Sequence, residues 1–373
     1  MTTARSFCTG YTGLEMAVRA AFGDFTVLSH SDIKPAANVL LAHHYPDIPN
    51  LGDMRAIDYT ALDRADLMIG SWPCQPHSSA GKRLGEADPR DLWPEYLRAI
   101  TVHRPAMFFG ENVARITSNG ELRRVVTSLA ELGYVVAWVV RAAADVGACH
   151  LRKRCFVVAV DGSVGATADP LGDLLRHEPG RGSRASREGA GIAGHDGPQR
   201  SVQRLSLLPT PTPTQSMTKG AGTSGRDGGL NLQTAVACLP TPSVADSRNT
   251  RNATARRSEG QEHHHSGWTL CDVAHADTWG KYGPAIARHE QALGRPAPEP
   301  TAGTTKAGNP LLNPAFVNWM MMLPEGHVTG VPGLTRSQQL SLLGDGVVPA
   351  QGAAAFAFLL NHLARRFASE RAA

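Results

Sequence analysis

Cys74 lies between two prolines at the end of a short apolar run, in the stretch GSWPCQP at 70–76. A structural cysteine is usually found among other hydrophobic residues in a strand or helix. Here the run 66–70 predicts a short buried parallel strand, and the residues that follow the cysteine are polar. Ligands collect at the carboxyl ends of such strands in open α/β sheets. Cys74 is therefore a candidate nucleophile.

An acid and two cations occupy comparable positions. Glu111 follows the apolar run 106–110, again at the end of an expected strand. A carboxylate beside aromatic residues often has a raised pKa, which suits proton donation to a base ring. Arg152 and Arg154 alternate with apolar residues at the start of another expected strand. This basic pair either lies on the solvated surface or binds a phosphate or a base carbonyl.

Gly10 and Gly13 lie in residues 6–15, which predict a strand, a loop and then a helix. Glycines let the backbone approach a ligand closely, and a helix N-terminus offers unpaired N–H groups. The full GxGxxG pattern of dinucleotide sites is absent, so a single adenosine-containing ligand fits better. Asp32 then stands where an acid could bind ribose hydroxyls, and Asp53 where one could face adenine. Either acid could instead be only a helix cap or a turn residue.

The elements that must position these residues alternate between strand and helix over the first 160 residues. This alternation predicts a mainly parallel sheet covered by helices, an α/β fold of the Rossmann-like class. Strands are expected at 25–29, 66–70, 106–110, 134–140 and 155–160, and helices at 14–22, 35–44, 91–103 and 121–132.

The alternation then stops. Residues 171–204 are rich in Gly, Arg, Ser and His and predict a surface loop or disordered insert. The stretch LPTPT at 208–212 recurs as LPTPS at 239–243, and such proline repeats predict extended backbone in a linker or a small irregular domain. Residues 244–310 are also expected to be irregular. A packed helix is expected at 310–323 and an amphipathic helix at 351–367.

Composition sets further limits. The chain has 373 residues and a net charge of +4, which permits nucleic-acid binding without requiring it. Its six cysteines contain no CxxC pair, which argues against a zinc ribbon and favours a reducing compartment. Three adjacent histidines at 263–265 cannot all face one ion, so no metal is expected. The absence of an 18-residue uninterrupted apolar run predicts a cytoplasmic protein without a membrane segment.

Taken in order, these stretches resemble the DNA (cytosine-5) methyltransferases of bacteria and phages. The resemblance covers residues 5–160 and 333–367. Ser6, Cys8, Thr12, His150 and Asp345 replace the residues usual in the family. The matching stretches are FCTGYTGL at 7–14 (motif I), Asp32 (II), Asp53 (III), GSWPCQP at 70–76 (IV), ENV at 111–113 (VI), HLRKR at 150–154 (VIII) and GDGVVP at 344–349 (X).

The resemblance implies S-adenosyl-L-methionine as the cofactor, double-stranded DNA as the substrate and the following site residues. The implied catalytic residues are Cys74, Glu111, Arg152 and Arg154. The implied cofactor-binding residues are Cys8, Thr9, Gly10, Tyr11, Thr12, Gly13, Asp32, Ile33, Asp53, Met54, Pro73, Asp345, Gly346 and Val347. The implied DNA-binding residues are Gln75, Ser78, Ser79, Lys82 and Arg83, in a loop that could close over DNA.

The implied reaction explains these residue types. A thiolate from Cys74 adds to C6 of a flipped cytosine, because C5 alone is too weak a nucleophile to take a methyl group. Glu111 contacts the ring N3 and the exocyclic amine, Arg154 holds O2, and Arg152 supports the loop or the thiolate.

Three regions are expected: a catalytic domain at 1–165, an irregular target-recognition domain at 166–326, and a return to the catalytic domain at 327–373. We expect a monomer, with any restriction endonuclease on a separate chain. Methylation of RNA cytosine and a non-catalytic DNA-binding homologue are the alternatives. A NAD-linked oxidoreductase would require the third glycine and gives Cys74 no role.

Overall fold

The computed structural model describes residues 2–73, 91–163, 238–244, 246, 270, 279, 282–306, 308 and 310–372. Several residues singled out by the sequence lie outside this part of the chain. They are Cys74, Gln75, Ser78, Ser79, Lys82, Arg83, the LPTPT stretch at 208–212 and the histidines at 263–265.

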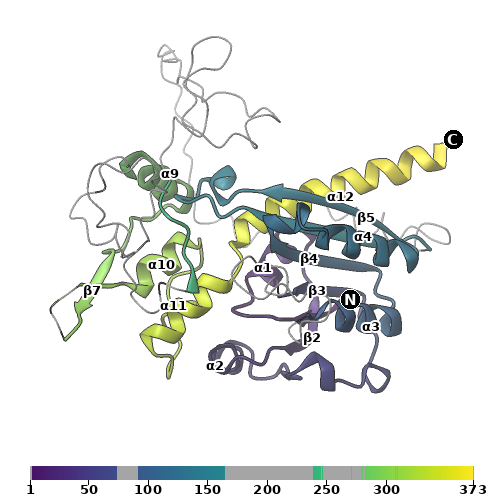
Figure 1. Cartoon of the computed structure of the whole chain (residues 1–373), viewed down its shortest axis with the longest axis horizontal. Helices are drawn as coiled ribbons and strands as arrows, with labels where there is room; N and C mark the ends of the chain where they lie inside the picture. Colours follow the sequence, from purple (N-terminus) through teal and green to yellow (C-terminus); the bar gives the residue numbers. More distant parts are fainter. Residues whose placement is uncertain are drawn as a thin grey trace, which may run out of the picture.

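A six-stranded sheet forms the centre of the molecule (Figure 1). Its order is β2 (Thr26–Ser31), β1 (Thr3–Phe7), β3 (Leu67–Ser71), β4 (Met107–Val113), β6 (Arg154–Asp161) and β5 (Tyr134–Arg141). The first four strands are parallel, and β6 runs antiparallel to both of its neighbours. The expected mainly parallel sheet is confirmed. The reversal at β6 follows from the link 142–153, which contains only the short 3-10 turn Ala143–Val146 and no crossover α-helix.

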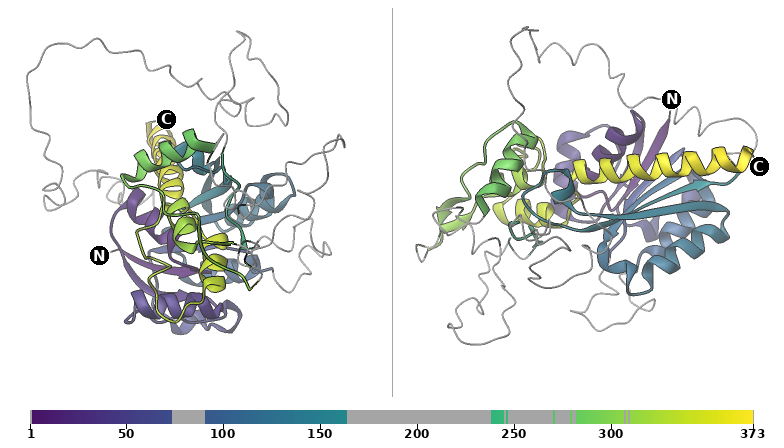
Figure 2. Two further views of the ribbon diagram at one scale, coloured as in Figure 1. Left: turned by 90° about the vertical axis from the view of Figure 1, so that its left-hand side faces the viewer. Right: turned by 90° about the horizontal axis from the view of Figure 1, so that it is seen from above.

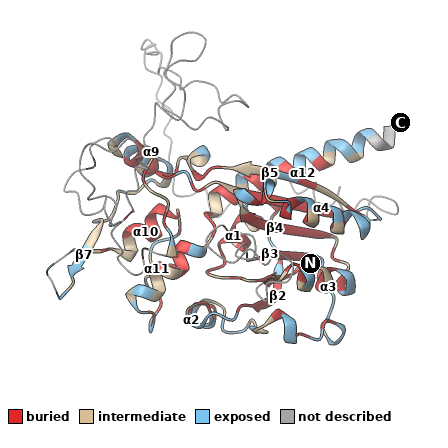
Figure 3. Cartoon of the chain, in the orientation of Figure 1, coloured by how far each residue is buried: buried red, intermediate tan, exposed pale blue. Residues whose placement is uncertain are grey.

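Helices cover both faces of the sheet, as the two further views show (Figure 2). The helices α1 (Gly13–Phe22) and α12 (Pro349–Ala372) pack on one face, and α3 (Trp93–His103) and α4 (Glu121–Glu131) on the other. The alternation of side chains along a strand divides the two cores. Phe109 on β4 packs towards α1 and α12, whereas its neighbour Phe108 packs towards α3 and α4. The interiors of β1, β3, β4 and β6 are almost wholly buried, whereas most of β5 is only partly buried (Figure 3).

A third core joins the sheet to a smaller lobe. It contains residues of α2 (Pro35–His44), α9 (Gly283–Leu293), α10 (Pro314–Met320) and α11 (Arg336–Asp345). A hairpin of β7 (Thr301–Thr304) and β8 (Pro310–Leu312) lies beside these helices (Figure 1). The expectation of irregular structure throughout 244–310 was wrong at α9 and β7. Gly294 follows α9 with a positive φ of 67°, a conformation that commonly ends a helix. The irregular composition of the stretch hid this signal in the sequence.

The single helix expected over 310–323 was also wrong. Residues 310–312 form β8, and α10 begins only at Pro314. Asn313 explains the boundary, because its side chain accepts a hydrogen bond from the Ala315 N–H and caps the helix. Proline at the first helical position favours the same start.

The C-terminal helix α12, Pro349–Ala372, is longer than the expected 351–367, and one of its faces is part of the hydrophobic core. By length and composition alone, the stretch Arg336–Ser369 could cross a membrane. However, the helix is broken between α11 and α12, and 56% of its most apolar window is buried inside the protein. One face of α12 packs on α1 and on Phe109 and Phe156 of the sheet. This burial is that of a core helix in a folded domain.

Candidate functional site

A pocket of about 410 Å³ lies at the carboxyl ends of β1, β3 and β4. The chain leaves β1 for β2 on one side and returns to β3 on the other, so a crevice opens between β1 and β3. All the predicted cofactor-binding residues except Thr12 line this pocket, together with Glu111 and Arg154. Sequence reasoning missed other residues of its lining, among them Lys34, Arg55, Leu92 and Asn112.

The loop after β1 turns sharply at the pocket. Cys8, Gly10 and Thr12 all have positive φ, at 51°, 57° and 67°. The Gly10 N–H donates to Oδ2 of Asp32 (2.8 Å), which fixes the loop against the end of β2. Thr12, buried behind the loop, lies within hydrogen-bond distance of the Tyr45 hydroxyl (3.2 Å). Burial raises the pKa of the Cys8 thiol to about 12, so Cys8 stays neutral in the pocket wall.

The two predicted acidic residues, Asp32 and Asp53, both line the pocket. Asp32 is only 7% exposed, and its Oδ1 accepts a second backbone hydrogen bond from the Lys34 N–H (2.9 Å). Asp53 caps a 3-10 turn by accepting from the Arg55 N–H and also forms an ion pair with the Arg55 guanidinium (3.4 Å). Ile33, the residue after Asp32, lines the pocket and is 62% exposed. The pocket wall thus combines carboxylates with an open apolar side chain.

Residues 344–347, near the C-terminus in the sequence, form one wall of the pocket. A Cβ on Gly346 would lie 1.8 Å from Cε1 of Tyr11, so only glycine fits there. The Tyr11 hydroxyl donates to the Val347 carbonyl (2.7 Å). Lys34 and Asp345 form an ion pair of 2.6 Å at the same end of the pocket. Residues 346 and 347 therefore pack against the loop that follows β1.

Glu111 and Arg154 meet at the pocket. The Arg154 Nε lies 2.9 Å from Oε1 of Glu111, and both side chains are largely buried. They come from the adjacent antiparallel strands β4 and β6, so the pairing of these strands fixes their approach. The next residue, Asn112, donates to the Trp72 carbonyl at the end of β3 (2.9 Å). A carboxylate and a guanidinium are therefore held together beside the strand that leads to Cys74.

Arg152 does not line the pocket. It is 2% exposed and has a φ of 29°, and its guanidinium donates to the carbonyls of Pro242, Gly344 and Gly346. Burial, followed by the charge of Arg154, lowers the pKa of Arg152. Its described contacts connect backbone segments, whereas those of Arg154 face the pocket. The assignment of Arg152 to catalysis stays a prediction.

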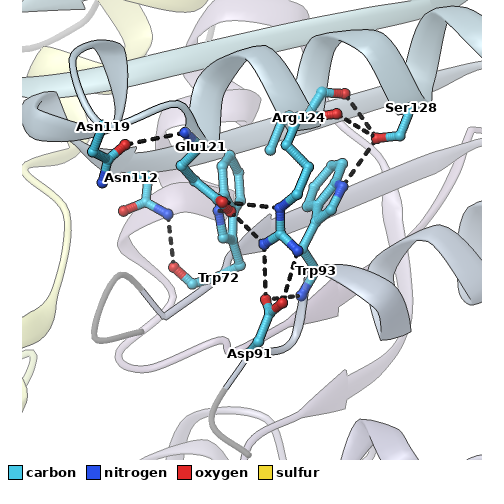
Figure 4. A network of polar contacts seen from close by, with 9 residues as sticks. Trp72, Asp91, Trp93, Asn112, Asn119, Glu121, Arg124 and Ser128 are labelled. Atoms are coloured by element: carbon cyan, nitrogen blue, oxygen red, sulfur yellow. Dashed lines mark hydrogen bonds and ion pairs between the residues drawn. The ribbon is translucent and has the colours of Figure 1, made fainter. Parts of the chain in front are cut away.

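A network of ion pairs around Arg124, which the sequence did not predict, includes Trp72 of the pocket lining (Figure 4). Arg124 on α4 pairs with both oxygens of Asp91 (2.7 and 2.9 Å) and with Glu121 (2.8 Å). The Trp72 indole N–H donates to the same Glu121 carboxylate (3.2 Å). Trp72 and Asp91 lie close to either side of residues 74–90. The only sequence signal was the Glu121–Arg124 spacing of three residues.

No metal site accompanies the pocket in the part of the chain that the structure describes. No group of three or more His, Cys, Asp or Glu side chains is placed there to hold an ion.

The N-terminal part of the chain is similar to known proteins. The C-5 cytosine-specific DNA methylase family model matches residues 2–179. Type II methyltransferase M.NgoMIV of Neisseria gonorrhoeae is 33% identical over 163 residues, covering 42% of this chain and 51% of that protein. M.NlaIV of Neisseria lactamica is 33% identical over 156 residues, covering 39% and 37%. The match thus spans about half or less of each relative's length.

Solved structures agree on the fold. The S. pombe Dnmt2 methyltransferase superposes with a TM-score of 0.53 at 16% identity, covering 97% of this chain and 99% of that one. The Entamoeba histolytica methyltransferase EhMeth gives 0.51 at 14% identity with the same coverage. The Rossmann-like fold expected from the sequence is confirmed, and the family model supports the resemblance over residues 2–179.

Proposed function

We propose that this chain, whose residues 2–179 match the C-5 cytosine-specific DNA methylase family model, methylates carbon 5 of cytosine in double-stranded DNA. The observation that carries the proposal is the Glu111–Arg154 pair, held at 2.9 Å in a pocket that also contains the glycine loop. A carboxylate and a guanidinium can together bind the donor and acceptor edge of a cytosine ring.

The pocket fits S-adenosyl-L-methionine. Its volume lies within the range of about 300–1,000 Å³ typical of small-molecule sites. Each oxygen of Asp32 accepts one backbone hydrogen bond and keeps capacity for a ribose hydroxyl, while Ile33 offers an apolar surface to the adenine. The lining contains four carboxylates and three cations, an excess that suits a ligand with a sulfonium charge. When bound, the cofactor supplies the electrophilic methyl group.

The protein residues then have distinct tasks. The Cys74 thiolate adds to C6, which moves electron density to C5 and lets the ring take the methyl group. Glu111 binds N3 and the exocyclic amine of the flipped base and stabilises the adduct. Arg154 donates to O2 and keeps Glu111 in place through their ion pair. Loss of the C5 proton and departure of the Cys74 sulfur then restore the ring.

The base must leave the duplex, because C6 is inaccessible within the stack. Unstacking costs a few kcal/mol, which the contacts of the bound base offset. The relatives are type II methyltransferases, so we propose one recurring target sequence and a separate cognate endonuclease. We further propose that the protein acts as a monomer in the cytoplasm, and that 166–326 reads the target.

The test is base-resolution mapping of methylcytosine in a host that has none of its own. The wild-type chain is expected to methylate one short sequence, and Cys74→Ala to methylate nothing while still binding S-adenosyl-L-homocysteine. Methylation confined to RNA would favour the alternative substrate. Methylation by Cys74→Ala would remove the nucleophile from the proposal.

A further inference from the structure

The segment Leu239–Ser243, the second copy of the LPTP repeat, is seated against the catalytic sheet. Leu239 donates its N–H to the Cys149 carbonyl (2.7 Å) and forms a parallel bridge with His150. His150 in turn lies 3.0 Å from the Met320 carbonyl through its Nε2. The segment was expected to belong to target recognition, yet it contacts the residues that lead into β6.

Arg152 links this segment to the pocket. Its backbone N–H donates to the Thr241 hydroxyl oxygen (3.1 Å), and its Nη1 donates to the Pro242 carbonyl (2.9 Å). Its Nη2 donates to the carbonyls of Gly344 (2.9 Å) and Gly346 (2.5 Å). One buried side chain thus connects two segments that lie about a hundred residues apart in the sequence.

The contact between these segments is close at the backbone level. A Cβ on Gly344 would lie 2.3 Å from the carbonyl carbon of Ser243 and 2.4 Å from the Val244 nitrogen. The Ser243 backbone is itself fixed, because its N–H and hydroxyl both donate to Oδ2 of Asp246 (2.7 and 3.0 Å). Since the neighbours are backbone atoms, the fit cannot adjust by rotating a side chain.

The other side of the same turn forms the pocket. Gly344, Asp345, Gly346 and Val347 all line it, and Gly346 packs directly on the Tyr11 ring. If the Leu239–Ser243 segment moved, Arg152 would move with it and displace the turn 344–346 that lines the pocket.

We propose that Leu239–Ser243 is a positioning strap for the cofactor pocket, in which Thr241 and Pro242 hold Arg152 and Arg152 holds the turn Gly344–Gly346. This rests on the proposed function, because it takes the pocket to be the site of S-adenosyl-L-methionine. The strap belongs to the region assigned to target recognition, so that region sets cofactor affinity as well as DNA contacts.

Three single variants of the full-length protein test the strap. Thr241→Val keeps the shape of the side chain but removes the acceptor for the buried Arg152 N–H. Thr241→Ser restores the hydroxyl. Thr210→Val makes the equivalent change in the first LPTP copy, at a position outside the described residues. S-adenosyl-L-homocysteine affinity is measured by calorimetry, with KM and kcat from methylation of DNA and the melting temperature of each variant.

Thr241→Val is expected to weaken S-adenosyl-L-homocysteine binding about 5- to 20-fold, in line with the loss of a partly buried hydrogen bond. KM for the methyl donor is expected to rise in parallel, with kcat changed less than about threefold. Thr241→Ser is expected to restore affinity, and Thr210→Val to leave it unchanged.

Two results would overturn the strap. One is a lower melting temperature for Thr241→Val with unchanged affinity, which would make its role purely structural. The other is equal weakening by Thr210→Val. Both leave the proposed function standing, whereas a wild-type protein that binds no S-adenosyl-L-homocysteine would overturn both proposals.

Discussion

The two halves of the pocket are held by different kinds of contact. On the side formed by residues 344–347, Arg152 donates to the carbonyls of Gly344 and Gly346, Tyr11 donates to the Val347 carbonyl, and Gly346 packs against the Tyr11 ring. On the side that leads to Cys74, Arg124 binds two carboxylates in ion pairs (Figure 4). The first side is held mainly by backbone contacts, with one exposed ion pair between Lys34 and Asp345, whereas the second is held by largely buried ion pairs.

This difference has consequences for the effect of a substitution. A close fit between backbone segments is disrupted by adding a single methyl group. A buried ion pair fails when one partner is removed, because the remaining charge stays desolvated. Glu111 and Arg154 lie where the two halves meet, so they are sensitive to errors on either side.

The largest effect is expected at this meeting point. Glu111→Gln removes the carboxylate that would stabilise the cytosine adduct, and kcat is expected to fall by about 10²- to 10⁴-fold. S-adenosyl-L-homocysteine affinity is expected to stay within about threefold. Single-turnover methylation and calorimetry measure the two quantities. Near-normal turnover would remove Glu111 from the chemistry.

Loss of Arg124 tests the charged half. Arg124→Met removes the guanidinium that pairs with Asp91 and Glu121, whose side chains are 4% and 2% exposed. We expect the free energy of unfolding to fall by about 3–5 kcal/mol. Urea denaturation measures it, and methylation below the transition is expected to slow without loss of cofactor affinity.

Arg123→Met is the matched control for this change, because Arg123 is the exposed neighbour on the same helix. It is expected to change stability by no more than about 0.5 kcal/mol. Equal effects from the two variants would mean that the ion pairs around Arg124 contribute nothing specific.

A methyl group tests the backbone half. Gly346→Ala would bring a Cβ to within 1.8 Å of Tyr11, so the turn must move at a cost of about 1–3 kcal/mol. We expect S-adenosyl-L-homocysteine binding to weaken at least about tenfold. Gly283→Ala, where a Cβ meets open space, is the control and is expected to bind normally. Normal binding by Gly346→Ala would contradict the close fit.

The smallest effect concerns pH. Burial, more than any other cause, lowers the pKa of His150 to about 3 from an ordinary value of 6.5. The unfolded chain therefore binds a proton between these values that the folded chain excludes, so stability falls as pH drops from 6.5 towards 3. We expect a loss of about 1–3 kcal/mol by pH 4.

Urea titrations at several pH values measure this loss. His150→Gln retains a donor for the Met320 carbonyl and cannot titrate, so it is expected to have a shallower pH dependence. An identical pH dependence in the two proteins would show that His150 is not the group responsible.

The sequence predicted the elements that follow from hydrophobic periodicity. The ranges expected for α1, α2, α4 and β3 lie within two residues of those observed. Periodicity does not report strand direction, so the reversal of β6 was missed. The boundary at Asn313 was missed because a side-chain cap interrupts an otherwise continuous apolar run.

The site was predictable where its residue types are distinctive. Glu111 and Arg154 were both identified, and the structure brings them together. The contacts of Arg152 and of Leu239–Ser243 could not be read in advance, because their partners are backbone carbonyls that any residue supplies. Arg124 is one of many charged residues in the chain, and only the fold brings it to Asp91.

The proposed attack of Cys74 on cytosine C6 can be tested by trapping the covalent adduct. A target duplex with fluorine at C5 of the cytosine cannot lose a C5 proton, so the enzyme is expected to remain attached after methyl transfer. Mass spectrometry of the digested complex should place the nucleotide on Cys74. An unmodified Cys74, with methylation of the ordinary duplex proceeding normally, would contradict the account.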